Sequence, residues 1–345
     1  MDSLTQIALG ATVAAVLVRP DQRRRALVYG AVLGTLPDLD VLVRYGDPVA
    51  DFTYHRSFSH SLFVLLALTP LLWLAARRVD RALQDRRWLW AFGLALVTHP
   101  LLDALTIYGT QLWWPWWPTP VGLGSVFIID PLYTLPLLVA MVSVYRRPLS
   151  SGPALALALS LSSAYLAWGA LAQAHVAGVA RAALAAQGHP NAPMLALPSP
   201  FNSMLWRVIV REPGGYREAY YSLLADAEPG PWQWHASADQ WQASLGAIPA
   251  FQRLQWFTHG YYSLSEENGA LVVSDLRMGS APAYLFRFAI ARREGDGLVA
   301  MPPEQRPSLA GLSAAAGWLW QRLRTPGAAM PRSDEVLSAS RAPER

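Results

Sequence analysis

Six apolar segments separated by short polar loops constrain the fold of this chain more than any other feature. They cover residues 4–18, 26–36, 61–76, 88–108, 126–145 and 153–172. A helix needs ~20 apolar residues to cross a bilayer, a length that three of the segments approach and the first two do not. The short helices could tilt, thin the membrane or pack as a hairpin shielded by the longer ones. The pattern predicts an α-helical membrane bundle of about six transmembrane helices, some of them short.

The composition supports a membrane protein with a second, polar region. Of all residues 53% are hydrophobic and only 15% are charged, against about 25% charged in a typical soluble protein. The apolar excess lies before residue 175. Segment 4–18 lacks the basic start and cleavage site of a secretory signal, so we expect it to be retained.

The arginine distribution predicts the orientation in the membrane. Eleven arginines lie in the first, third and fifth loops, whereas the loops at 37–60 and 109–125 hold only Arg44 and Arg56. Arginine-rich loops face the cytoplasm, so six crossings would place both termini outside it. The net charge of +4 gives no indication of nucleic-acid binding, because the arginines cluster at helix ends.

The chain after residue 174 has a different pattern. Aromatic and β-branched residues alternate in part near 204–210, 216–224, 257–264, 270–277 and 284–290, and a helix is expected across 238–253. We therefore expect a transmembrane domain at 1–174, a soluble α+β extracytoplasmic domain at 175–324, and a disordered tail at 325–345.

A set of histidines and aspartates lies near the predicted helix ends on one side of the membrane. Ionisable groups are rare in such segments and are usually functional. Histidine and carboxylate ligands without cysteine suit zinc or manganese, and this chain has no cysteine. The set comprises Asp38, Asp40, His55, His60, His99 and Asp103, with Arg56 among them.

The spacing within the set decides how its members can converge. His99 and Asp103 are four residues apart and share one helix face, which makes them a good ligand pair; a structural His–Asp hydrogen bond between helices is the alternative. His55 and His60 converge only if His55 lies in the loop and His60 in the first helical turn. Asp38 and Asp40 converge only on a turn, which Pro37 favours; helix capping is the simpler alternative for that pair.

Several runs of sequence resemble one known family. These runs are Asp2–Gln6, Gly34–Asp40, His55–Ser61 and Leu102–Gln111. They are similar to the bacterial YdjM-type inner-membrane proteins, which are described as metal-dependent hydrolases and as LexA-binding. The resemblance covers roughly residues 1–145 and implies a multi-spanning protein with a metal site at the Asp and His positions. It implies no particular substrate, and no protein partner can be assigned from the sequence.

These residue types favour a hydrolase. His55, His60, His99 and Asp103 would hold one divalent metal, zinc in the first place and manganese as the alternative. Asp38 or Asp40 would bind a second ion or act as general base, and Arg56 would stabilise charge on the reacting group.

A site bordered by lipid favours an amphiphilic or lipid-like substrate, either an ester, an amide or a phosphoester. The main alternative is a non-catalytic membrane scaffold, or a transporter whose His and Asp residues form an ion or proton path.

Overall fold

The computed structural model describes residues 1–295, 297–308 and 312–328. Most of the tail expected at 325–345 lies outside these residues. The chain divides into two compact units. The first contains Met1–Val43, His55–Leu171 and Pro200–Asn202, and the second contains Arg44–Tyr54, Ala172–Ser199 and the chain from Ser203 onward.

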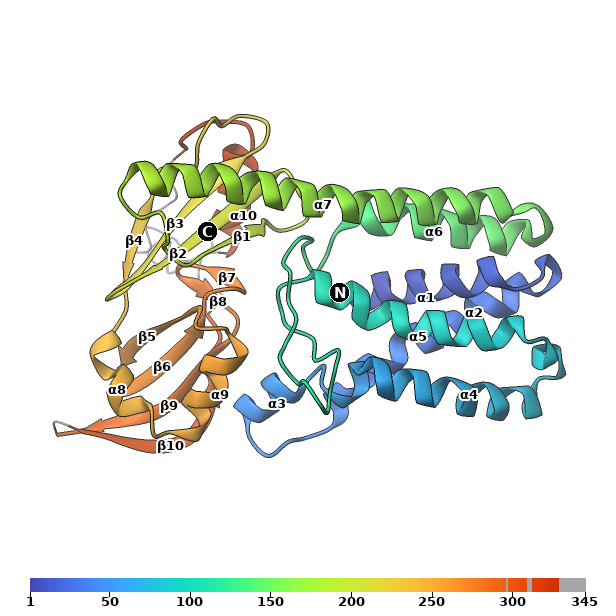
Figure 1. The fold of residues 1–345 in the computed structure, drawn as a ribbon, viewed down its shortest axis with the longest axis horizontal. Helices are drawn as coiled ribbons and strands as arrows, with labels where there is room; N and C mark the ends of the chain where they lie inside the picture. Colours follow the sequence, from blue (N-terminus) through green and yellow to red (C-terminus); the bar gives the residue numbers. More distant parts are fainter. Residues whose placement is uncertain (296, 309–311, 329–345) are drawn as a thin grey trace, which may run out of the picture. The chain divides into compact units, whose positions relative to one another are not determined.

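The first unit is a bundle of helices (Figure 1). Its α-helices are α1 (Ser3–Leu17), α2 (Arg23–Thr35), α4 (Leu62–Val79), α5 (Arg87–Leu105), α6 (Pro131–Arg146) and the first part of α7 (Gly152–Ala186). Short 3-10 helices join them: η1 (Pro20–Gln22), η2 (Leu36–Leu42), η3 (Phe58–His60), η4 (Arg81–Gln84) and η5 (Pro148–Ser150).

Polar side chains fix where three of these helices begin. Asp2, Ser61 and Asp130 each accept a hydrogen bond from a backbone N–H of the first turn, in α1, α4 and α6 respectively. Such caps satisfy N–H groups that have no partner within the helix. Asp130 also accepts a hydrogen bond from Tyr165 in α7 at 2.7 Å, so this aspartate caps α6 and ties α7 to it.

Helix α1 is the buried centre of the first unit and packs on α2, α5 and α6. Its contact with α2 depends on glycine. A Cβ atom at Gly10 or Gly30 would lie 2.3 Å from the other residue's carbonyl oxygen, and one at Gly34 would lie 2.4 Å from Gln6 O. The Gly-x-x-x-Gly pair in α2, Gly30 and Gly34, therefore allows close backbone approach.

The expected count of about six transmembrane helices is not supported. Within the described residues three helices are long and apolar enough to cross a membrane: Leu62–Val79, Arg87–Leu105 and Gly152–Ala186. Helices α1, α2 and α6 have 15, 13 and 16 residues, which is short of the ~20 that a bilayer requires. Pro20 follows α1 and Pro37 follows α2, and proline opposes continuation of a helix.

The arginine-rich loops of the first unit lie together at one end of the bundle. Arg25 is 3.3 Å from Asp80 in the third loop, and Arg23 donates to Pro148 O in the fifth loop at 3.0 Å. Figure 1 shows the α1–α2, α4–α5 and α6–α7 connections at the same end. Of the predicted site residues, five lie in regular elements, Asp38 and Asp40 in η2, His60 in η3, and His99 and Asp103 in the last turns of α5. His55 and Arg56 lie in the turn between α3 and η3.

The second unit is built on antiparallel sheets. One has the order β1-β2-β3-β4, with β1 (Met194–Pro198), β2 (Leu205–Glu212), β3 (Gly215–Ser222) and β4 (Gln233–Ala236). The other has the order β10-β9-β6-β5, with β5 (Tyr262–Glu267), β6 (Ala270–Asp275), β9 (Arg287–Glu294) and β10 (Gly297–Gln305). A short pair, β7 (Gly279–Ser280) and β8 (Ala283–Tyr284), completes the sheets of the described residues.

The helices of the second unit differ in part from the expectation. The helix expected across 238–253 is three pieces, η6 (Asp239–Trp241), α8 (Gln242–Leu245) and α9 (Pro249–Phe257), because Pro249 starts a new helix. Helix α3 (Pro48–Tyr54) comes from a loop of the predicted bundle, and its Phe52 stacks on Phe286 with ring centroids 4.4 Å apart. Helix α10 (Leu312–Arg322) follows the last strand.

Candidate metal centre

Four side chains from three elements converge in the first unit: Asp38 from η2, His60 from η3, and His99 and Asp103 from α5. One ligand atom from each lies within 4.8 Å of all the others. Helix α5 continues through Pro100, so His99 and Asp103 remain one turn apart on the same face, as their spacing predicted.

The separations between the ligand atoms suit a tetrahedral ion. The Nε2 atoms of His60 and His99 are 3.1 Å apart. Asp103 Oδ2 is 3.2 and 3.3 Å from them, and Asp38 Oδ1 is 3.4 Å from each. Ligands at 2.0–2.1 Å in a tetrahedron are about 3.3–3.4 Å apart. The five separations that involve a histidine are therefore close to those of a zinc-type site, and the two carboxylates offer ligand atoms within 4.8 Å of each other.

The other nitrogen of each histidine fixes the tautomer. His99 Nδ1 lies 2.6 Å from Gly34 O, a carbonyl that can only accept, so Nδ1 carries the proton. Ser59 donates its hydroxyl proton to Asp40 Oδ2 at 2.6 Å, and its oxygen lies 2.9 Å from His60 Nδ1. Because that hydroxyl proton is used, His60 Nδ1 is the donor to Ser59. In the neutral rings both Nε2 atoms then present lone pairs, which is the form that binds a metal.

The carboxylate oxygens that face the histidines lack other partners. Asp38 Oδ1 and Asp103 Oδ2 are buried and have no hydrogen-bond partner. The second oxygen of Asp103 accepts from Gln6 Nε2 at 3.1 Å and from the amino group of Met1. Buried acceptors that face one another without a donor are costly. A divalent cation would compensate for that cost, so the residues present fit a metal.

Asp40 and His55 lie beside these four side chains. Asp40 Oδ1 is 2.7 Å from His55 Nδ1, and Oδ2 accepts from the backbone N–H of Arg56 at 2.9 Å. Burial raises the pKa of Asp40, but the His55 hydrogen bond and the neighbouring histidine charges outweigh burial and hold it below the usual range. Both Asp40 oxygens already have donors, which suits a residue that orients others.

Arg56 adjoins the centre, with Nη2 3.4 Å from Asp103 Oδ1 and its side chain buried. The remaining four histidines, His175, His189, His235 and His259, all lie in the second unit. Two groups that support the histidines were not assigned from the sequence, the hydroxyl of Ser59 and the carbonyl of Gly34. A small hydroxyl residue next to His60 is the one signal that could have indicated the first.

Comparison with known proteins agrees with the membrane character of the first unit. The YdjM inner membrane protein family matches residues 1–176. Inner membrane protein YbcI of Escherichia coli (strain K12) is 37% identical over 93 residues, which are 27% of this chain and 53% of that protein. Uncharacterized protein YfhP of Bacillus subtilis (strain 168) is 29% identical over 129 residues, 35% of this chain and 38% of that protein.

The matched regions thus span about half or less of these relatives, and none of these names states an activity. No solved structure matches the chain. The family match covers half of the sequence and contains all four converging side chains. This chain belongs to the YdjM inner membrane protein family, with helices that could span the membrane and a His/Asp cluster that could bind a metal ion.

Proposed function

We propose that this chain is a membrane-embedded, metal-dependent hydrolase that acts on an amphiphilic ester or phosphoester at the extracytoplasmic face. One observation carries the proposal. Four buried acceptor atoms converge, with each histidine Nε2 3.1–3.4 Å from the other three and the histidine protons held on the opposite ring nitrogens. A purely structural His–Asp pair would instead place a histidine N–H against a carboxylate oxygen.

The roles of the residues follow from their contacts. Asp38, His60, His99 and Asp103 would hold the metal, zinc first and manganese as the alternative. When bound, such an ion lowers the pKa of a water molecule toward neutrality and polarises the bond to be cleaved. Asp40 orients His55 directly and His60 through Ser59, and Gln6 orients Asp103.

The setting of the site supports an amphiphilic substrate. Long apolar side chains are exposed on the outer faces of the helices, among them Leu71 at 62%, Leu135 at 58% and Leu157 at 60%. A continuous apolar exterior of this kind suits lipid contact. Trp116 and Trp117, at 65% and 66% exposure, fit the aromatic belt at the membrane–water boundary.

The arginine loops support the extracytoplasmic orientation. These loops lie together at one end of the bundle. The ligands come from η2, η3 and the last turns of α5, which are near the other ends of the helices. The positive-inside rule then assigns the metal centre to the opposite side from the cytoplasm.

A turnover screen tests the proposal. Purified, zinc-loaded protein is incubated with a membrane lipid extract, and products are identified by mass spectrometry. We expect a hydrolysis product that is absent with Asp103→Asn and retained with the control Asp21→Asn, whose side chain is exposed. A metal-loaded protein that cleaves nothing would favour the ion-path or scaffold alternative.

A further inference from the structure

The guanidinium of Arg56 is buried beside the metal centre with unused hydrogen-bond donors. The residue is 3% exposed. Its Nε and Nη1 atoms have no partner, while Nη2 lies 3.4 Å from Asp103 Oδ1. The same carboxylate oxygen also accepts hydrogen bonds from Gln6 Nε2 and from the Met1 amino group. The positive charge of Arg56 is thus only partly paired.

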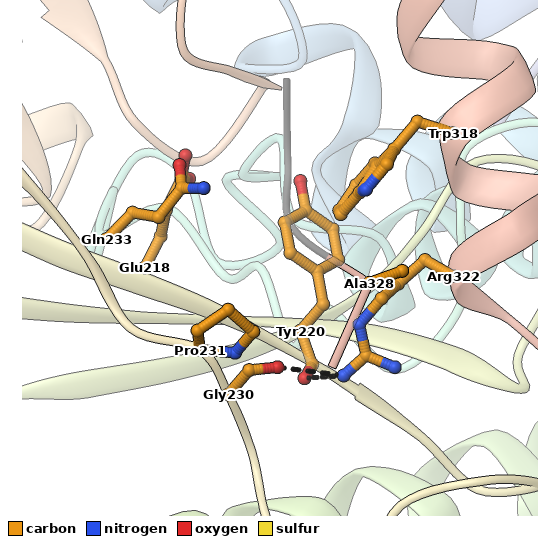
Figure 2. A pocket seen from close by; sticks show the side chains of 8 residues that line it. All are labelled: Glu218, Tyr220, Gly230, Pro231, Gln233, Trp318, Arg322 and Ala328. Carbon is orange, nitrogen blue, oxygen red and sulfur yellow. Dashed lines mark hydrogen bonds between the residues drawn. The ribbon is translucent and has the colours of Figure 1, made fainter. Parts of the chain in front are cut away.

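Other buried arginines in the described chain show what a structural role looks like. Arg207 donates from Nε to Glu218 and from Nη1 to two backbone carbonyls, each at 2.6–2.7 Å. Arg322 donates from Nη2 to the carbonyl oxygens of Tyr220 and Gly230 (Figure 2) and to Asp226. Neither is among the described residues that have a buried side-chain nitrogen without a partner. Arg56 differs because two of its three guanidinium nitrogens lack an acceptor.

The backbone of Arg56 is held in an unfavourable conformation that fixes this position. Its φ is +64°, a value that residues with a Cβ seldom adopt. Two hydrogen bonds hold it there: the Arg56 N–H donates to Asp40 Oδ2, and the Gln111 N–H donates to Arg56 O, both at 2.9 Å. The Tyr108 ring lies 4.9 Å from Cζ. These contacts hold the Arg56 guanidinium beside the metal centre although the backbone conformation of the residue is unfavourable.

Two nitrogens of the Arg56 guanidinium lack an acceptor. A guanidinium fork is suited to two oxygens of one tetrahedral anion. An unpaired buried donor is costly, so an anion beside the metal centre would compensate for that cost.

We propose that Arg56 binds the non-bridging oxygens of a phosphoryl group, so that the substrate class is an amphiphilic phosphoester. This inference rests on the proposed function and narrows it. A neutral carboxylic ester or amide carries no charge to compensate for the buried guanidinium, whereas a phosphoester does.

The reaction is a simple hydrolysis. The oxygen of water forms a bond to phosphorus, the bond from phosphorus to the alcohol oxygen breaks, and that oxygen takes up one proton of the water. Arg56 stabilises the charge on the oxygens that remain bound to phosphorus.

Binding of inorganic phosphate to the full-length, zinc-loaded protein tests Arg56 without any turnover. Calorimetric affinity is compared for wild type, Arg56→Gln, Arg56→Lys and the control Arg44→Gln, whose side chain is 84% exposed. We expect Arg56→Gln to weaken binding by at least about tenfold with unchanged zinc content. The Arg56→Lys variant should recover part of the phosphate affinity, because lysine keeps the positive charge but lacks the paired N–H donors of the guanidinium.

Turnover of two matched probes then tests the substrate class. We expect wild type to cleave 4-nitrophenyl octyl phosphate in preference to 4-nitrophenyl octanoate. Wild-type protein that holds zinc but does not bind phosphate, or that prefers the octanoate, would overturn this inference and leave the hydrolase standing. Equal phosphate affinity in folded Arg56→Gln would also overturn it. Absence of zinc from wild type would instead overturn the proposed function.

Discussion

The Nε2 atoms of His60 and His99 face each other at 3.1 Å, although neither carries a proton in the neutral tautomer. Two lone pairs at this distance repel unless a cation lies between them. Because the opposite nitrogens are held by Ser59 and Gly34, neither ring can relieve the repulsion by changing its tautomer without losing a hydrogen bond. This relationship is the strongest argument for a metal in this centre.

Ser59 is predicted to be a positioning residue. Ser59→Ala removes the group that links Asp40 to His60 Nδ1 and should weaken zinc affinity by roughly 10–100-fold without abolishing binding. Competition against a chromophoric chelator measures the affinity. Ser150→Ala, at an exposed position far along the chain, serves as the control. Equal zinc affinities in the two variants would show that Ser59 does not position His60 for metal binding.

Gly34 is predicted to couple helix packing to the metal centre. Alanine there would place a Cβ atom 2.4 Å from Gln6 O, so α1 and α2 must separate at a cost of about 1–3 kcal/mol. Gly34 O, the acceptor for His99, would move with them, and both thermal stability and zinc affinity should fall. At Gly178 an added Cβ meets nothing within 4 Å. Gly178→Ala should therefore leave both quantities unchanged or improve stability, and equal losses in the two variants would contradict the packing argument.

Glu218 in the second unit is predicted to make the stability of that unit depend on pH. Burial raises its pKa, but the facing Arg207 and the neighbouring His235 outweigh burial and hold it below the ordinary value of 4.5. A group whose pKa is lowered on folding stabilises above its unfolded pKa, and this contribution is lost as the pH falls through the folded value. The protection of the β2 and β3 amides against hydrogen exchange, relative to the intrinsic rate at each pH, should therefore decrease as the pH falls below about 4.5.

Variants separate the charge from the shape of Glu218. Glu218→Gln leaves Arg207 buried with a neutral partner and should lower the free energy of unfolding by about 3–5 kcal/mol at pH 7. The same substitution should also make the free energy of unfolding less dependent on pH. The exposed Glu294 provides the control Glu294→Gln, and a buried-site variant as stable as this control would show that the ion pair contributes little.

Labelling of single cysteines tests the orientation, which the absence of native cysteine makes possible. In spheroplasts an impermeant maleimide should react with Leu123→Cys and Ala227→Cys but reach Ser150→Cys only after lysis, since the arginine-rich end faces the cytoplasm. All three positions are exposed. The reverse pattern would put the metal centre on the cytoplasmic side.

Local patterns explain which parts of the fold could be predicted. All six apolar segments are helices, because apolar runs ended by Pro and Arg leave few alternatives. The last one, expected at 153–172, continues to Ala186 in α7. The number of crossings was wrong, since a 15-residue apolar helix such as α1 can be buried by its neighbours rather than by lipid. Helix α3 was missed because its Phe52 packs against aromatic residues more than 200 positions away, which no local pattern reports.

The site could be predicted in composition but not in detail. The i, i+4 spacing was sufficient to pair His99 with Asp103, and Pro37 indicated the turn that carries Asp38. From the sequence we expected His55 as the fourth ligand, with Asp38 at a second ion or as a base. The choice between the two depends on how η2 and η3 fold against α5, which residue spacing does not report. In the structure Asp38 is within 3.4 Å of both histidines, while His55 is engaged with Asp40.

The metal content of purified protein tests the central claim most directly. Elemental analysis of wild type should find about one equivalent of zinc or manganese per chain, bound by four protein ligands. His60→Ala, His99→Ala, Asp103→Asn and Asp38→Asn should each lose most of it, whereas His189→Ala, an exposed histidine of the second unit, should keep it. Full occupancy in the folded ligand variants, or a wild-type protein that binds no divalent metal, would contradict the account.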